Sequence, residues 1–85
     1  MPQTYLVECY WPGVTEESLT QLSRSSEAGD VAWLESILVP EDEIVLCLFE
    51  GPSEEAVRES SRRSGLPSER VTRSVRIRAN ERSTP

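Results

Sequence analysis

The order of strand-type and helix-type segments most limits how this chain can fold. Four segments are rich in β-branched, aromatic and aliphatic residues and are bounded by Pro, Gly or Asp, which is typical of strands. They cover residues 5–13, 31–39, 43–51 and 70–78. The second and third are separated by only Pro40, Glu41 and Asp42, so they form a hairpin.

Helix signals fill the two longer intervals. Thr15 is a good N-cap, and the first helix is expected to run to about Ala28, before Gly29. Ser53 is the N-cap of the second helix, which Gly65 ends.

A βαββαβ order in 85 residues predicts one small α+β domain. The most frequent arrangement of this order is ferredoxin-like, with a four-stranded antiparallel sheet of spatial order 4-1-3-2 and both helices on one face. We expect the domain to span residues 1–78 and residues 79–85 to form a flexible polar tail.

Strand alternation sorts the residues onto two faces. The helix-covered face is expected to carry Val7, Cys9, Ala32, Leu34, Ser36, Leu38, Val45, Cys47 and Phe49. The other face is expected to carry Leu6, Glu8, Tyr10, Val31, Trp33, Glu35, Ile37, Val39, Ile44, Leu46, Leu48, Glu50, Val71, Arg73, Val75 and Ile77. The second set is too apolar to stay in water, which predicts a homodimer with facing sheets, a dimeric α+β barrel.

Charged residues on this second face are the candidate site. Carboxylates enclosed among apolar walls cost free energy to bury, so packing alone does not explain them. Glu8 and Glu35 lie in mid-strand. The alternative interpretation is that these charges reach solvent near strand ends and prevent edge-to-edge aggregation. Glu50, beside Gly51 and Pro52, is most open to that interpretation.

The first functional hypothesis is a cofactor-independent acid/base enzyme of the cyclase, isomerase or dehydratase type, acting on a small organic molecule in the barrel. Glu8 or Glu35 would transfer the proton and Arg73 would hold a carboxylate or enolate oxygen. The substrate-binding residues would be Tyr10, Trp33 and Glu50.

Composition excludes several other classes of function. The chain has no histidine and no lysine, so imidazole bases, histidine metal sites and Schiff bases are absent. A net charge of −6 argues against nucleic acid as a partner. No apolar run approaches the length of a membrane span and no signal peptide is recognisable, so we expect a cytoplasmic protein with Cys9 and Cys47 reduced in its core.

Three stretches carry a resemblance to a known family: MPQTYLVE, WLES and VLCLFEGPSEEAVRESSRRSGLPSERV. They resemble a family of small bacterial ferredoxin-like proteins, a domain of unknown function with some members described as nickel-binding. The resemblance covers nearly the whole chain and implies a dimeric α+β barrel.

The chain departs from that family where metal ligands matter. Many relatives have histidine where this chain has Ser60 or Ser61, and some have histidine at the position of Glu35. The second hypothesis, which the nickel-binding members of that family suggest, is a non-catalytic protein that sequesters a metal ion or a small molecule. Any metal would be held by Glu8, Glu35 and Glu50, whose oxygens suit calcium, magnesium or manganese better than nickel. The third hypothesis is an interaction module whose exposed sheet face pairs with a different protein.

Overall fold

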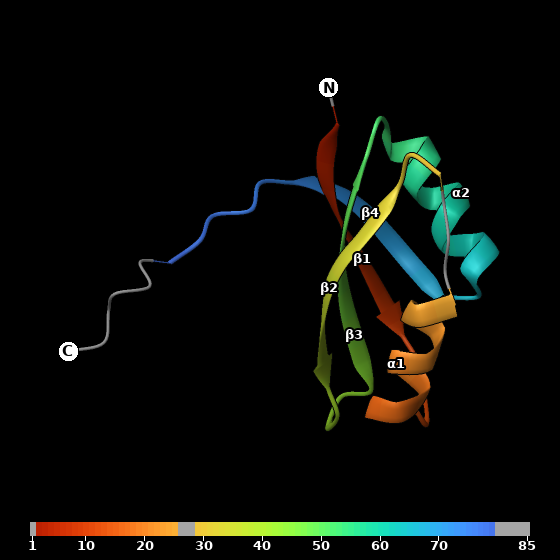
Figure 1. Ribbon diagram of the computed structural model, residues 1–85. Helices are drawn as coiled ribbons and strands as arrows, with labels where there is room; N and C mark the ends of the chain where they lie inside the picture. Colours follow the sequence, from red (N-terminus) through yellow and green to blue (C-terminus); the bar gives the residue numbers. More distant parts are fainter. Residues whose placement is uncertain (1, 26–28, 80–85) are drawn as a thin grey trace.

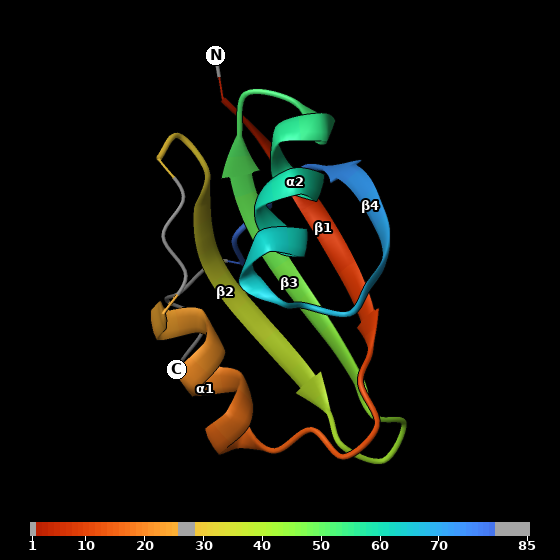
Figure 2. The ribbon, with the colours of Figure 1, turned by 90° about the vertical axis from the view of Figure 1, so that its right-hand side faces the viewer.

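The computed structural model describes residues 2–25 and 29–79. The elements are β1 (Gln3–Tyr10), α1 (Glu16–Ser25), β2 (Ala32–Val39), β3 (Ile44–Gly51), α2 (Glu54–Ser64) and β4 (Ser68–Ser74). The four strands form one antiparallel sheet of order β2-β3-β1-β4, and both helices lie on the same side of it (Figures 1 and 2). The ferredoxin-like α+β fold and its strand order are confirmed.

Some expectations fall outside the described residues. These are the end of the first helix near Ala28 and the tail beyond Ala79. Within the described part of the chain, no helix is long and apolar enough to cross a membrane.

The predicted caps begin both helices. Thr15 Oγ1 accepts from the Ser18 backbone N–H at 3.0 Å, and Ser18 Oγ accepts from the Thr15 N–H at 3.0 Å. Ser53 Oγ accepts from the Ala56 N–H at 3.1 Å. These side chains satisfy backbone donors that have no partner inside the helix.

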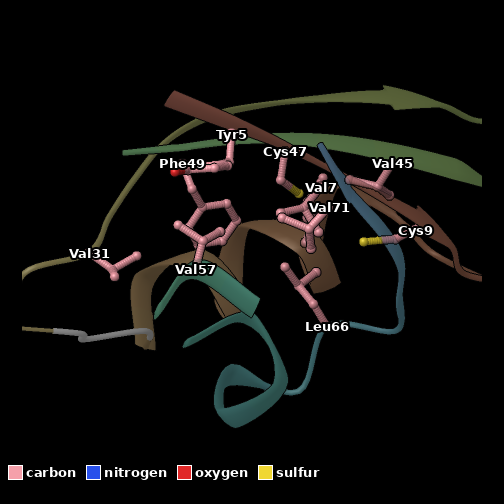
Figure 3. Close-up of a cluster of buried hydrophobic side chains, with 11 residues drawn as sticks. Tyr5, Val7, Cys9, Val31, Val45, Cys47, Phe49, Val57, Leu66 and Val71 are labelled. Carbon is pink, nitrogen blue, oxygen red and sulfur yellow. The ribbon is translucent and has the colours of Figure 1, made fainter. Parts of the chain in front are cut away.

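The core lies between the sheet and the helices (Figure 3). It consists of Tyr5, Val7, Cys9, Leu19, Val31, Val45, Cys47, Phe49, Val57, Leu66 and Val71. Gly51 lets α2 approach β3, because a Cβ atom there would lie 2.9 Å from Val57 Cγ2 and 3.1 Å from Val31 Cγ2. A side chain at this position would push the helix away from the sheet.

A β-bulge in β2 corrects the predicted face of its first residues. The register with β3 shifts between Trp33 and Glu35, so Trp33 lies opposite Phe49 and Glu35 lies opposite Leu48. Val31 and Trp33 therefore face the helices, whereas Ala32 and Leu34 are exposed. One inserted residue reverses side-chain alternation along a strand.

The last strand is also shorter than predicted, and its two faces are reversed. β4 ends at Ser74, and Val75 and Ile77 lie beyond it. Val71 pairs with Val7 and Arg73 pairs with Tyr5, so both lie on the face that the helices cover. The predicted grouping of Val71 and Arg73 with Glu8 is wrong.

Candidate functional site

The sheet face turned away from the helices, called the open face below, is not covered by any helix or strand of the described residues (Figure 1). The strand register places on it Thr4, Leu6, Glu8 and Tyr10 of β1, Ala32, Glu35, Ile37 and Val39 of β2, Ile44, Leu46, Leu48 and Glu50 of β3, and Arg70, Thr72 and Ser74 of β4. Leu6, Leu46 and Leu48 are half-buried and Ile37 is 56% exposed. The open face is an apolar centre with charged groups around it.

The three predicted carboxylates share the open face but do not form one cluster. Glu8 lies opposite Leu46, and Glu35 lies opposite Leu48 on the far side of β3. Two strand spacings separate Glu8 from Glu35, roughly 10 Å or more at the backbone. Glu35 pairs with Leu48, and Glu50 lies two residues further along β3 on the same face. Glu35 and Glu50 are therefore diagonal neighbours, about 7–8 Å apart at Cα.

Arginines that the sequence analysis did not select contact these carboxylates. Arg70 Nη1 lies 3.9 Å from Glu8 Oε2, and Arg76 Nη2 lies 3.3 Å from Glu35 Oε1. The predicted Arg73 instead donates from Nε to Gln3 Oε1 on the helix-covered face. Correct pairing of β4 with β1 would have identified Arg70, because it lies directly opposite Glu8.

Around Glu8 and Glu35, the described residues leave the open face largely exposed. The side chains of Glu8 and Glu35 are 39% and 54% exposed, and Tyr10 is half exposed. A hollow that touches Glu8 measures about 90 Å³ and is also lined by Cys9, Tyr10, Ile44 and Glu69. Sites for small molecules usually measure about 300–1,000 Å³.

The predicted aromatic wall is divided between the two faces. Tyr10 is at one end of the open face, opposite Ile44. Trp33 faces the helices, where its ring stacks on Phe49 with ring centroids 5.2 Å apart. Trp33 is therefore a packing residue within one subunit.

The two cysteines are buried thiols on the helix-covered face, Cys9 on β1 and Cys47 on β3. Hydrogen bonding to Cys47 and then burial raise the pKa of the Cys9 thiol. Ser36 Oγ donates to Cys47 Sγ at 3.5 Å. A protonated, inaccessible thiol is a poor metal ligand and a poor nucleophile.

The donor set within one subunit does not fit a nickel site. Among residues 2–25 and 29–79, no three His, Cys, Asp or Glu side chains gather closely enough to hold a metal ion. Ser60 and Ser61 are buried in α2, in the helix layer, whereas Glu35 is on the opposite face of the sheet. These positions, at which the resemblance implies histidine in relatives, do not meet in one subunit.

Comparison with known proteins gives two matches. The model of a family described as nickel-responsive protein SCO4226-like matches residues 5–73. The crystal structure of SCO4226 from Streptomyces coelicolor A3(2) superposes with a TM-score of 0.70 at 23% identity, covering 89% of this chain and 99% of that one. No curated protein matches the sequence.

The family match corrects the main functional expectation. A family described as nickel-responsive points to a metal-related role, not to an acid/base cyclase, isomerase or dehydratase. The geometry agrees with this correction, because Arg73 lies on the other face from Glu8 and Glu35.

Proposed function

This chain belongs to the SCO4226-like family of nickel-responsive proteins, and on that premise we propose that it is a non-catalytic protein that binds a divalent metal ion. The observation that carries the proposal is the family match over residues 5–73, which include both helices and all of the sheet except its ends.

Glu35 and Glu50 are the proposed metal-contacting pair. They are diagonal neighbours on the open face, and Glu50 has no ion-pair partner among the described residues. Two carboxylates leave a divalent ion with too few ligands, so a second copy of the chain supplies further ones. Glu8 is too far from Glu35 in its own subunit and can contribute only from that second copy. Without imidazole, such a site binds nickel more weakly and less selectively than a histidine site does.

A homodimer through the open face is the second part of the proposal. Its support is the apolar centre of that face, which one subunit leaves partly in water. The sheets of two copies would then face one another, and carboxylates from both would line the space between them. The buried free thiols fit a reducing compartment, so the proposed location is the cytoplasm.

Calorimetric titration and native mass spectrometry with Ni²⁺ and Mn²⁺ test the metal proposal. We expect a stoichiometric metal adduct, with affinity at least tenfold weaker in Glu35→Gln and Glu50→Gln. The matched control is Glu55→Gln, because Glu55 is an exposed carboxylate in the first turn of α2 on the other side of the sheet. Absence of both heat and adduct at millimolar metal would overturn the proposal, as would an equal loss of affinity in the control.

A further inference from the structure

A short extended segment follows β4 and leaves the sheet on its open-face side. Residues 75–79, called the arm below, belong to no helix or strand. Figure 1 shows this blue segment running away from the sheet in the direction opposite to the two helices. Its apolar side chains Val75 and Ile77 are 74% and 83% exposed.

The arm has the pattern of a strand that lacks its partner. Val75 and Ile77 alternate with Arg76 and Arg78, which puts apolar groups on one side and guanidinium groups on the other in an extended chain. The backbone of the arm makes no sheet pairing. Two adjacent β-branched side chains exposed to this extent indicate a contact surface that one subunit does not complete.

Charge identifies the surface that the arm fits. The open face carries Glu8, Glu35 and Glu50 against Arg70 and against Arg76 of the arm, which leaves a formal net charge of −1, and Arg78 is the second arginine of the arm. Arg76 already binds Glu35 of its own subunit, while Arg78 and Glu50 have no ion-pair partner among the described residues. Every copy has one basic arm and one acidic open face, so two copies complement each other reciprocally.

We infer that the arm of one copy packs on the open face of a second copy. Val75 and Ile77 cover apolar residues at the edge of that face, including Ile37, and the positive charge of Arg78 meets the net negative charge of that face. The inference rests on the proposed homodimer and adds the segment that holds it together. Such contacts reach around the partner, so they are expected to slow its dissociation.

Cross-linking in trans tests the arm contact directly. One full-length preparation carries Ile77→Cys, and a second, made heavier by a tag, carries Ile37→Cys. Mild oxidation of the mixture should join one light and one heavy chain by a disulfide between the two introduced cysteines. The native Cys9 and Cys47 are buried, so they should not react. Replacing Ile37→Cys by Pro67→Cys, an exposed position after α2, should give none. No mixed product, or an equal yield with Pro67→Cys, would overturn the inference.

Sedimentation separates failure of the arm from failure of the dimer. The Val75→Ser, Ile77→Ser double variant should dimerise at least tenfold more weakly than the wild type, whereas Arg62→Ser, Arg63→Ser on α2 should not. A wild-type monomer of 9.6 kDa overturns both the dimer and the arm. A wild-type dimer that the serine variant leaves unchanged overturns the arm alone, and metal titration of that variant reports on the metal proposal separately.

Discussion

The indole Nε1 of Trp33 donates a hydrogen bond to Ser36 Oγ over 2.8 Å. Residues three apart in a regular strand point to opposite faces. The contact exists because the bulge between Trp33 and Glu35 brings both side chains to the helix-covered face. The same bulge sends Glu35 to the open face, so it decides both the packing of β2 and the position of a candidate metal ligand.

Loss of this hydrogen bond should destabilise the fold modestly. Ser36→Ala leaves a half-buried indole N–H without its partner and is expected to cost about 1 kcal/mol. Urea unfolding of Ser36→Ala, Trp33→Phe and the double variant should give a coupling energy of similar size. Strictly additive effects would contradict a direct bond between the two side chains.

Gly51 is required for the close approach of α2 to β3. Gly51→Ala places a methyl group 2.9 Å from Val57 Cγ2 and is expected to lower the free energy of unfolding by about 1–3 kcal/mol. Combining it with Val57→Ala removes the nearest clash. The double variant should therefore be more stable than the sum of the two single effects predicts, as measured by urea unfolding. An additive double variant would show that Val57 does not limit the approach.

Ser53 stabilises the start of α2. Ser53→Ala removes the acceptor for the Ala56 N–H and should cost about 1 kcal/mol, measured by thermal unfolding. Ser53→Asp is the control, because it keeps an oxygen acceptor and adds a negative charge at the helix N-terminus. If aspartate destabilises as much as alanine, capping is not the function of this residue.

The buried thiol of Cys9 makes stability depend on alkaline pH. Hydrogen bonding and burial raise the pKa of Cys9 above its ordinary value of 9.0, so the folded state holds this proton more tightly than the unfolded chain. The stabilisation is complete below that value and decreases as the pH rises above it. The urea midpoint should therefore fall more steeply above pH 9.0 in the wild type than in Cys9→Ala. Parallel curves for the two proteins would contradict this assignment.

The elements themselves follow from local chemistry. Thr15, Ser53 and Gly65 predict helix ends that the structure confirms, because capping depends on residues only a few positions away. The βαββαβ order and the short connection between the second and third strands leave few compact arrangements, and the observed order β2-β3-β1-β4 is the one expected. The fold class was predictable for this reason.

The candidate site was only partly predictable. Glu8, Glu35, Glu50 and Tyr10 lie on the open face as the alternation indicates, whereas Trp33 and Arg73 do not. The two errors have different causes. A face assignment holds only while the period of two is unbroken and only if its parity is known. The bulge in β2 interrupts it at Trp33, and in β4 the pairing of Val71 with Val7 fixes a parity that the spacing within the strand leaves open.

The sequence by itself determined the number, type and order of the elements, because propensity, capping and turn chemistry act within a few residues. Only the tertiary structure decided which charges meet. Arg70 reaches Glu8 through strand pairing, and Arg76 reaches Glu35 across 41 positions of sequence. Register between distant strands and the course of the chain beyond β4 depend on packing of the whole domain, and no local pattern encodes them.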